Sequence, residues 1–451
     1  MDKMSLQEGW IKKNLGTEGL SIIGSGINKF DEKKDYLSTK SINGDKIKQV
    51  EREISYNKRP SRANMQPIIN SVWFAKMKNT LKVYFFDEKN KDELDRYILS
   101  TGFAGILSRD CVPIYLKYFF LSLKFNLLKD KYSIGSTQMA INQNGISKIE
   151  VPFPKSLDKQ QQIVSAIETQ FSRLDETVEN LKSVKRKLEV YRKAVLKKAF
   201  LGGLVENISY DKKSLMREID KFNDTKEGQN KVRRLPQVDY SDLGELPKDW
   251  FFIECHKVCN SIRDGTHDSP KYVDEGFPLI TSKNLKNGLL DFTNIKFIKE
   301  KDFEEINKRS KVDEDDILFA MIGTIGNPVK IGKDPKFAIK NVGLFKNNGG
   351  KFILTSYLGY WLNSPSYFKI LESKKLIKGT TQKFIDLGSL RVSPVPVCSI
   401  REQEKIVQLI EEKFSVIDKV EEAVNKGLKK AEQLRKSILK IAFEGRLVKN
   451  G

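Results

Sequence analysis

The sequence is poor in the residues that most often build catalytic and metal sites, with two histidines and four cysteines among 451 residues. Because histidine is the usual general base near neutral pH, few candidates exist for acid–base catalysis. Four cysteines in so long a chain do not form a disulfide framework, so a reducing cytoplasm is the expected compartment. No apolar run approaches the ~20 residues of a membrane span, and the first residues lack the apolar core of a signal peptide.

Recognisable enzyme motifs are also lacking. The sequence contains neither an Asn-Pro-Pro-aromatic motif for amino-group methylation nor a Pro-Asp…Glu-x-Lys nuclease pattern. Residues 326–333 resemble a P-loop only superficially, since five residues separate the glycines and Asp334 replaces the required Ser or Thr. One cluster contains metal-ligand residue types: Cys255, His256, Cys259 and His267. Without a second C-x-x-C, buried cysteines near a loop histidine are the simpler interpretation.

The sequence does have an excess of positive charge. Lys and Arg number 80 against 59 Asp and Glu, a formal net charge of +21. Such an excess indicates a polyanionic partner, because neutralising phosphates releases counterions. A lysine-rich compositional bias without a partner is the alternative. Hydrophobic residues at 39% and aromatic residues at 10% are sufficient for folded cores, and the length indicates two to four domains.

A long internal repeat organises the chain. Residues 160–206 return at 403–449 with a constant offset of 243, and about 20 of the 47 aligned positions are identical. The chain is therefore predicted to alternate two globular units with two helical segments. A duplicated chain can present two similar surfaces about a pseudo-two-fold axis, which suits a partner with two halves, such as duplex DNA.

Each copy of the repeat has the pattern of a long helix. Apolar residues recur at alternating spacings of three and four from Val164 to Ala199 and from Val407 to Ala442, as in a coiled coil. Because one helix cannot bury such a seam alone, we expect an intramolecular antiparallel pair with one globular unit at each end. Charged residues interrupt the seam: Lys185, Arg192, Glu421 and Arg435. We interpret them as hydrated positions or as contacts with a partner protein.

The two globular units share landmarks. Each has a tryptophan near its start, Trp10 or Trp250, and each ends with a similar tetrapeptide, at 135–138 or 379–382, before a Val-Pro pair. Short β-rich runs alternate with loops, and helical stretches are predicted at 114–129 and 354–373, which favours an α+β fold. Residues 208–240 are polar, so we expect a mobile linker that returns the chain along the helices.

The predicted fold class is thus α+β, with two domains separated by two long antiparallel coiled-coil helices and a pseudo-two-fold internal repeat. The predicted boundaries are 1–153 for the first domain, 154–207 for the first helix, 208–240 for the linker, 241–397 for the second domain and 398–451 for the second helix.

Two variable units, each closed by Gly-[Ser/Thr]-Thr-Gln and Val-Pro, alternate with two helices that end in Ala-Phe-x-Gly-x-Leu-Val. Over essentially the whole chain, this plan resembles the specificity subunit of type I restriction–modification systems. The resemblance implies that each unit is a target-recognition domain for one half of a bipartite DNA site, and that the helices fix the gap between half-sites. It also implies docking of two methyltransferase subunits on the helices, with motor–nuclease subunits joining the assembly through them.

The resemblance further implies a non-catalytic chain that binds no cofactor, in a complex that methylates or cuts DNA site-specifically. Its partners would use S-adenosylmethionine, ATP and Mg²⁺. Two alternatives stay open. A DNA methyltransferase or nuclease with an unrecognised site would be active as the purified chain, whereas a coiled-coil interaction scaffold would bind without dependence on salt or DNA sequence.

Candidate DNA contacts are side chains that pair with base edges, mainly Arg, Lys, Asn and Gln, with Ser and Thr more adaptable. In the first unit they are Lys58, Arg59, Arg62, Asn64, Gln66, Thr137 and Gln138. In the second unit they are Arg263, Thr266, Lys283, Asn284, Thr381, Gln382 and Lys383. The candidate partner-docking residues on the helices are Lys185, Arg192, Phe200, Arg435 and Phe443. The plainer interpretation of each loop is solvated surface, and the tetrapeptides can equally be structural turns.

Overall fold

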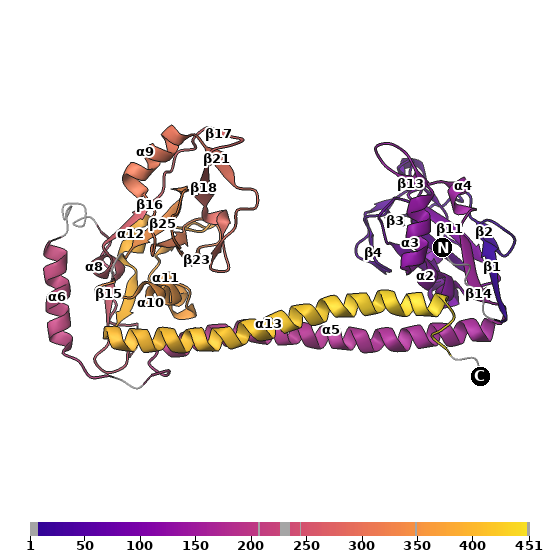
Figure 1. Ribbon diagram of the computed structural model, residues 1–451. Helices are drawn as coiled ribbons and strands as arrows, with labels where there is room; N and C mark the ends of the chain where they lie inside the picture. Colours follow the sequence, from indigo (N-terminus) through magenta and orange to yellow (C-terminus); the bar gives the residue numbers. More distant parts are fainter. Residues whose placement is uncertain (1–7, 206–207, 226–234, 244, 348–349, 449–451) are drawn as a thin grey trace. The chain divides into compact units, whose positions relative to one another are not determined.

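The computed structural model describes residues 8–205, 208–225, 235–243, 245–347 and 350–448. The chain divides into two compact units, Met1–Ser183 with Val424–Gly451 and Val184–Ala423. Each unit contains one globular domain and a part of each long helix (Figure 1). We call residues 8–154 the first domain and residues 241–397 the second domain.

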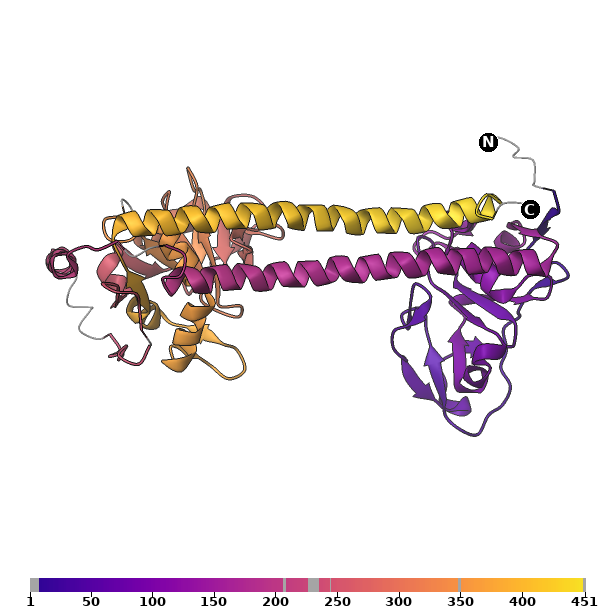
Figure 2. The ribbon, with the colours of Figure 1, turned by 90° about the horizontal axis from the view of Figure 1, so that it is seen from below.

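The two long helices follow the heptad pattern. They are α5 (Leu157–Phe200) and α13 (Ile400–Phe443), each of 44 residues. In unit 1 the guanidinium of Arg435 lies 4.4 Å from the ring centroid of Phe171, and in unit 2 that of Arg192 lies 4.9 Å from the ring of Phe414. Within each unit the two helices lie side by side and antiparallel, as predicted (Figure 2). No helix within the described ranges is long and apolar enough to cross a membrane.

The charged residues that interrupt the apolar seam form ion pairs between the two helices. Arg192 pairs with Asp418 and lies 3.6 Å from Glu421, and Lys185 lies 3.8 Å from the same glutamate. In unit 1, Arg435 pairs with Asp175. These side chains are partly exposed, so each pair contributes little stability alone. These charged side chains are partly exposed to solvent, as expected, but each of them also has an ion-pair partner on the other helix.

Both domains are built from two four-stranded sheets. In the first domain, one sheet contains, in order, β2 (Leu20–Ile22), β11 (Phe103–Ser108), β8 (Ser71–Ala75) and β9 (Val83–Phe86). The equivalent sheet of the second domain contains β16 (Ser261–Asp264), β25 (Val342–Lys346), β22 (Ile317–Ala320) and β23 (Gly326–Lys330). All neighbouring strands in both are antiparallel.

The other sheet of each domain includes one parallel pair. In the first domain its strands are, in order, β6 (Arg52–Ile54), β3 (Lys34–Leu37), β10 (Tyr97–Ser100) and β7 (Ala63–Met65), with β3 and β10 parallel. In the second domain they are β17 (Tyr272–Val273), β21 (Lys296–Ile298), β18 (Phe277–Thr281) and β24 (Ala338–Lys340), with β18 and β24 parallel. The mixture of sheets and separate helices confirms the α+β class.

Short two-stranded sheets complete each domain. They pair β1 (Trp10–Asn14) with β14 (Glu150–Pro154), β12 (Ser133–Ile134) with β13 (Ala140–Ile141), β15 (Phe251–Glu254) with β28 (Pro394–Val397), and β26 (Ile377–Lys378) with β27 (Phe384–Ile385). Two further hairpins are β4 (Ile42–Asn43) with β5 (Lys46–Ile47), and β19 (Leu285–Lys286) with β20 (Leu289–Leu290).

Each of the two stretches predicted to be helical, 114–129 and 354–373, consists of two separate helices. The first consists of α2 (Pro113–Leu121) and α3 (Leu123–Lys131), and the second of α10 (Thr355–Leu362) and α11 (Pro365–Ser373). The break lies at Ser122 or Ser364, whose hydroxyl accepts a hydrogen bond of 3.2 Å from the backbone N–H three residues later. A serine in this position caps the start of the second helix. The second domain also contains α8 (Cys255–Val258), α9 (Glu300–Ser310) and α12 (Leu387–Val392), and the first contains α1 (Asp92–Arg96) and α4 (Gln143–Ile146).

A buried glutamine fixes each domain to the start of its helix. Gln160 and Gln403 are both fully buried. The Gln160 amide donates to the Pro154 carbonyl at 2.8 Å and accepts from the Val112 N–H at 2.8 Å. Gln403 makes the same pair of contacts in unit 2, at 3.0 Å to the Cys398 carbonyl and 2.8 Å from the N–H of Leu354. Because unpaired buried polar groups are costly, these bonds define one docking position.

The predicted linker differs from expectation in its described parts, 208–225 and 235–240; residues 226–234 lie outside the described residues. Residues 212–224 form α6 (Lys212–Asp224), with Ile219 fully buried and Leu215 and Phe222 packed on the core of unit 2. Since these apolar residues share one helical face, the segment packs rather than remaining mobile. The described parts of the segment, α6 included, therefore belong to unit 2 together with the second domain.

The buried Lys129 is predicted to make the stability of the first domain depend on pH. Its side chain is 1% exposed and its ammonium donates to the Thr80 carbonyl; burial lowers its pKa from 10.5 to about 8. Between these values the unfolded chain binds more protons, so stability should rise from about pH 8 to pH 10.5. Lys129→Met should lack this rise in urea unfolding of the full chain, followed by tryptophan fluorescence. The exposed Lys131→Met should keep the wild-type pH profile, and a Lys129→Met profile parallel to wild type would contradict the assignment.

Candidate nucleic-acid interface

Each tetrapeptide forms the loop of a two-stranded hairpin, between β12 and β13 or between β26 and β27. Gly135 has φ +121° and Gly379 has φ +85°, and a Cβ there would lie 2.7 Å from the Gln138 carbonyl or 2.3 Å from the Gln382 carbonyl. The glycine is therefore required by the backbone. The candidate side chains that follow it are exposed: Thr137, Gln138, Thr381, Gln382 and Lys383.

Both hairpins are attached to the segment that follows a central strand. In the first domain the Lys78 N–H donates to the Met139 carbonyl at 2.9 Å, and in the second the Gly323 N–H donates to the Lys383 carbonyl at 3.1 Å. Isolated β-bridges join Met77 to Ala140 and Ile322 to Phe384 in the same places. The two domains thus present their tetrapeptides from equivalent positions, at the ends of β8 and β22.

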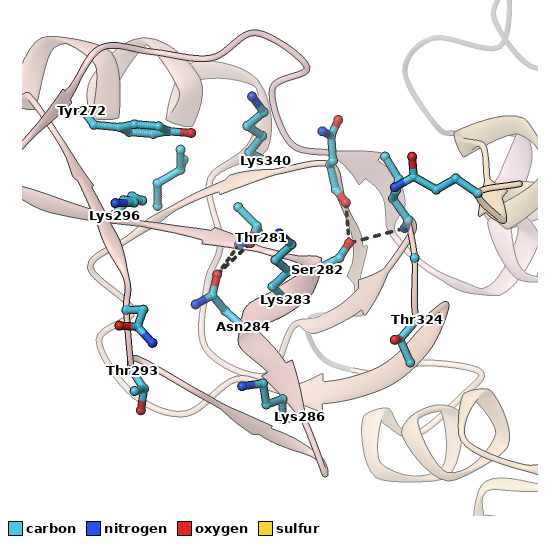
Figure 3. Close-up of a pocket in the computed structure, with 16 residues that line it drawn as sticks. Tyr272, Thr281, Ser282, Lys283, Asn284, Lys286, Thr293, Lys296, Thr324 and Lys340 are labelled. Atoms are coloured by element: carbon cyan, nitrogen blue, oxygen red, sulfur yellow. Dashed lines mark hydrogen bonds between the residues drawn. The ribbon is translucent and has the colours of Figure 1, made fainter. Parts of the chain in front are cut away.

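A cavity of about 730 Å³ opens beside the second tetrapeptide (Figure 3). It contains four lysines: Lys283, Lys286, Lys296 and Lys340. Four side-chain amides line it as well: Asn284, Asn294, Asn341 and Gln382. Among the described residues that line this cavity there is no Asp or Glu. Lys286 pairs with Asp291, which lies outside the lining, and the other three lysines make the charge of the cavity positive. Phosphate groups and base edges are the partners that such a mixture of cations and amides binds.

The cavity joins two of the loops expected from sequence to contact DNA, since Lys283, Asn284 and Gln382 all line it. Lys286, Lys296 and Lys340 were not predicted. They lie on β19, β21 and β24, and only the folded sheets bring them together. No local motif marks them, so pairing of the strands was the information that the sequence did not provide.

Asn284 has a structural role in its loop. Its Oδ1 accepts from the N–H of Thr281 at 3.0 Å and from its hydroxyl at 2.8 Å, and its Nδ2 donates to the Asp291 carbonyl at 2.9 Å. Only 8% of the residue is exposed. Asn284 therefore shapes the loop, whereas its exposed neighbour Lys283 is available to the cavity (Figure 3).

Residues 263–267, which we call a loop although Arg263 and Asp264 still belong to β16, are held against the β24–β25 turn. Backbone bonds of 3.1 Å join Thr266 to Ile339 and to Asn341. His267 lies between Asn341, with Nδ1 to Oδ1 at 2.8 Å, and Asp264, with Nε2 to Oδ2 at 3.0 Å. The guanidinium of Arg263 donates to the Arg309 carbonyl at 2.7 Å, although its side chain remains exposed.

In the basic segment 58–66 of the first domain, some candidate side chains contact other residues of the chain and others are exposed to solvent. Arg59 donates to the Tyr56 carbonyl at 2.6 Å and lies 4.1 Å from the centroid of the Tyr56 ring. Lys58 and Arg62 are exposed, whereas Asn64 and Gln66 are half-buried. The exposed pair is therefore the more accessible part of this predicted site.

Lys76 is a candidate that the sequence did not reveal. It follows β8 directly, is half-buried, and has its pKa lowered by burial and by the nearby Arg62. Neither cation forms an ion pair with another residue in the described part of the chain, so both can receive an anion. Met321 occupies the position directly after β22 in the second domain and is 4% exposed, so the two domains differ here.

The residues with metal-ligand side chains do not form a site. Cys255 and Cys259 are fully buried in the core, and burial raises the pKa of the Cys255 thiol to about 12. His267 contacts Asp264 and Asn341 instead. Across the described ranges, no three His, Cys, Asp or Glu residues are grouped to hold a metal ion. The P-loop-like residues begin with strand β23 rather than a loop leading into a helix.

Two candidate docking residues on the helices are buried inside the chain. Phe443 packs on Tyr115 and Phe119, with ring centroids 5.2 Å and 5.4 Å away, and Phe200 packs on Tyr357 and Trp361, at 5.1 Å each. They are 4% and 1% exposed, so they complete domain cores rather than present a docking surface. The other candidates, Lys185, Arg192 and Arg435, are partly exposed beside their ion-pair partners.

If the cavity binds phosphates, its lysines should control the salt dependence of DNA binding. Lys283→Gln combined with Lys296→Gln should weaken binding to random-sequence duplex DNA. The slope of log affinity against log salt should fall by about 0.9 for each phosphate that the variant no longer neutralises. Lys213→Gln, at an exposed position of α6 outside the cavity, is the single-charge control. Equal slopes for wild type, the control and the double variant would exclude phosphate binding at this cavity.

The type I restriction modification DNA specificity domain model matches residues 18–189 and 247–430. The specificity subunit of the type I restriction enzyme EcoBI from Escherichia coli is 28% identical over 301 residues, which cover 66% of this chain and 58% of that subunit. The EcoKI specificity subunit from Escherichia coli strain K12 is 24% identical over 357 residues, covering 77% and 68%. The chain thus spans about three fifths of the length of the first of these relatives and about two thirds of the second.

Solved structures share the fold. A chain from a structure concerned with complex assembly and conformational transition of the type I R-M system has a TM-score of 0.70 at 17% identity, covering 98% of this chain and 99% of that one. The HsdS subunit from Thermoanaerobacter tengcongensis has a TM-score of 0.52 at 18% identity, with the same coverage. At these identities the likeness concerns the fold alone. The sequence model, however, matches both halves of the chain, and the protein therefore belongs to the type I restriction modification DNA specificity domain family.

Proposed function

We propose that this protein is the DNA-recognition subunit of a type I restriction–modification complex. Each domain reads one half of a bipartite target, and the target-recognition domains occupy residues 1–153 and 241–397. The observation that carries the proposal is the cavity of the second domain, where four lysines meet the amides of Asn294, Asn341 and Gln382 without an acidic side chain among the described lining residues. Cations bind the DNA backbone without regard to sequence, and amides distinguish base edges.

The differences between the two domains support two different half-sites. Their main sheets have the same strand order, and their tetrapeptide loops are held in the same way. The surrounding residues differ, as with Lys76 after β8 and Met321 after β22. A shared scaffold with dissimilar loops is what two readers of different short sequences require.

The helices, in this proposal, set the gap between half-sites and bind two methyltransferase subunits on their exposed faces. The motor–nuclease subunits join through that assembly. The chain performs no catalysis itself, whereas the assembled complex methylates or cuts DNA in the cytoplasm. S-adenosylmethionine, ATP and Mg²⁺ serve the partner subunits, and this chain binds none of them.

Co-expression with its cognate type I methyltransferase, followed by mapping of methylated adenines across a genome, tests the proposal. The expected result is a bipartite motif, two short blocks separated by a constant number of unread bases. Exchanging the second domain for that of a related subunit should change one block and leave the other intact. A continuous motif would contradict two separate readers, and methylation by the purified chain alone would indicate an enzyme. Absence of both a complex and methylation would favour the scaffold alternative.

The length of the helices predicts the length of the gap. Seven residues add about 10 Å to a helix, which is about three base pairs of duplex DNA. Inserting one heptad into both α5 and α13, at the boundary between the two units, should lengthen the gap by about three base pairs while both blocks keep their sequence. Replacing the same heptads with others of equal length is the control. An unchanged gap in the lengthened variant would contradict the helices as the spacing element.

A further inference from the structure

Ser282 occupies the centre of the second-domain cavity, at the end of β18 (Figure 3). Its hydroxyl donates to the Asn341 carbonyl at 2.9 Å. The same oxygen accepts hydrogen bonds from the N–H groups of Met321, at 3.2 Å, and Ile322, at 3.4 Å. One small side chain therefore joins the ends of β18, β22 and β24, which come from different regions of the sequence.

Each segment bound by Ser282 supports another candidate reading loop. The Met321 carbonyl accepts from the Ile385 N–H at 2.9 Å, and Ile322 bridges to Phe384, which fixes the tetrapeptide hairpin. Asn341 binds the Thr266 carbonyl through its N–H at 3.1 Å, which fixes the loop at 263–267. Ser282 itself begins the turn that presents Lys283.

We propose that Ser282 is the positioning residue of the second half-site reader. It holds the loops at 263–267, 281–284 and 380–383 in one common geometry. This inference rests on the proposed function, because it requires that these loops contact DNA. Ser282 acts through the three loops and need not touch a base, since its hydroxyl is engaged by three backbone groups.

A positioning role differs from a direct contact in how specificity weakens. A side chain that contacts one base affects discrimination at that base alone. Removal of the Ser282 hydroxyl releases the ends of three strands together. Discrimination should therefore weaken at several positions of the second block, while the first block keeps its full stringency.

The test compares Ser282→Thr with Ser282→Val in the complete methyltransferase complex. These substitutions have nearly the same shape, but only threonine retains the hydroxyl. Methylation is measured at cognate sites and at sites with one mismatch in either block. In Ser282→Val the ratio of cognate to mismatched methylation should fall by roughly three- to tenfold at several second-block positions, the scale of one net hydrogen bond. Ser282→Thr should stay within about twofold of wild type, which separates the hydroxyl from the bulk of the side chain.

Lys283→Ala is the direct-contact control, and its effect should be confined to a single position or to overall affinity. A Ser282→Val complex with wild-type ratios, or with a decrease at only one position, would overturn the positioning role. Equal decreases in both Ser282 variants, or in both blocks, would also overturn it, because these indicate bulk or general misfolding. Failure of the proposed function is distinguishable, since the wild-type complex would then produce no bipartite motif.

Discussion

The ends of the two long helices complete the cores of the two domains, and the remaining structure depends on this burial. Phe443 enters the aromatic cluster of the first domain, and Phe200 enters that of the second. At the other helix ends, Gln160 and Gln403 bind backbone groups that would otherwise be buried and unpaired. Each domain is therefore held by the beginning of one helix and the end of the other.

In this arrangement, the residues that attach the domains to the helices differ from the loops that we propose to contact DNA. The repeated residues are those that hold: a glutamine, a phenylalanine under an arginine, and a phenylalanine in the core, each occurring once in each unit. The loops that follow the central strands contribute none of these repeated contacts, so their sequences can differ between the two domains. Lysines and amides have accumulated there in the second domain, and Lys76 and Arg62 lie together in the first. Divergence in the loops is compatible with a fixed scaffold, because the repeated glutamine, arginine and phenylalanine contacts come from α5 and α13 and not from the loops.

The sequence predicted the helices and their antiparallel pairing well, because a heptad pattern is local and the repeat doubles it. It also located the tetrapeptide loops, whose glycines reflect a backbone requirement at Gly135 and Gly379. It failed where pairing between distant strands was decisive. Lys296 and Lys340 line one cavity only because β21, β18 and β24 are neighbours in the sheet. Asn284 was predicted to read a base because the sequence does not reveal its hydrogen bonds to Thr281 and Asp291. Similarly, three apolar residues on one face of α6 were too few to stand out in a polar segment.

The division of the chain into units also affects the order in which the protein folds during synthesis. Unit 2 is continuous, from Val184 to Ala423, so its core residues leave the ribosome together. The core of the first domain includes Leu439, Ala442 and Phe443, which are synthesised after the whole of unit 2. More than 300 residues are therefore added after Tyr115 and Phe119 before Phe443, which packs on both, is synthesised. Although N-terminal domains usually fold first during translation, here the second domain can reach its native packing before the first.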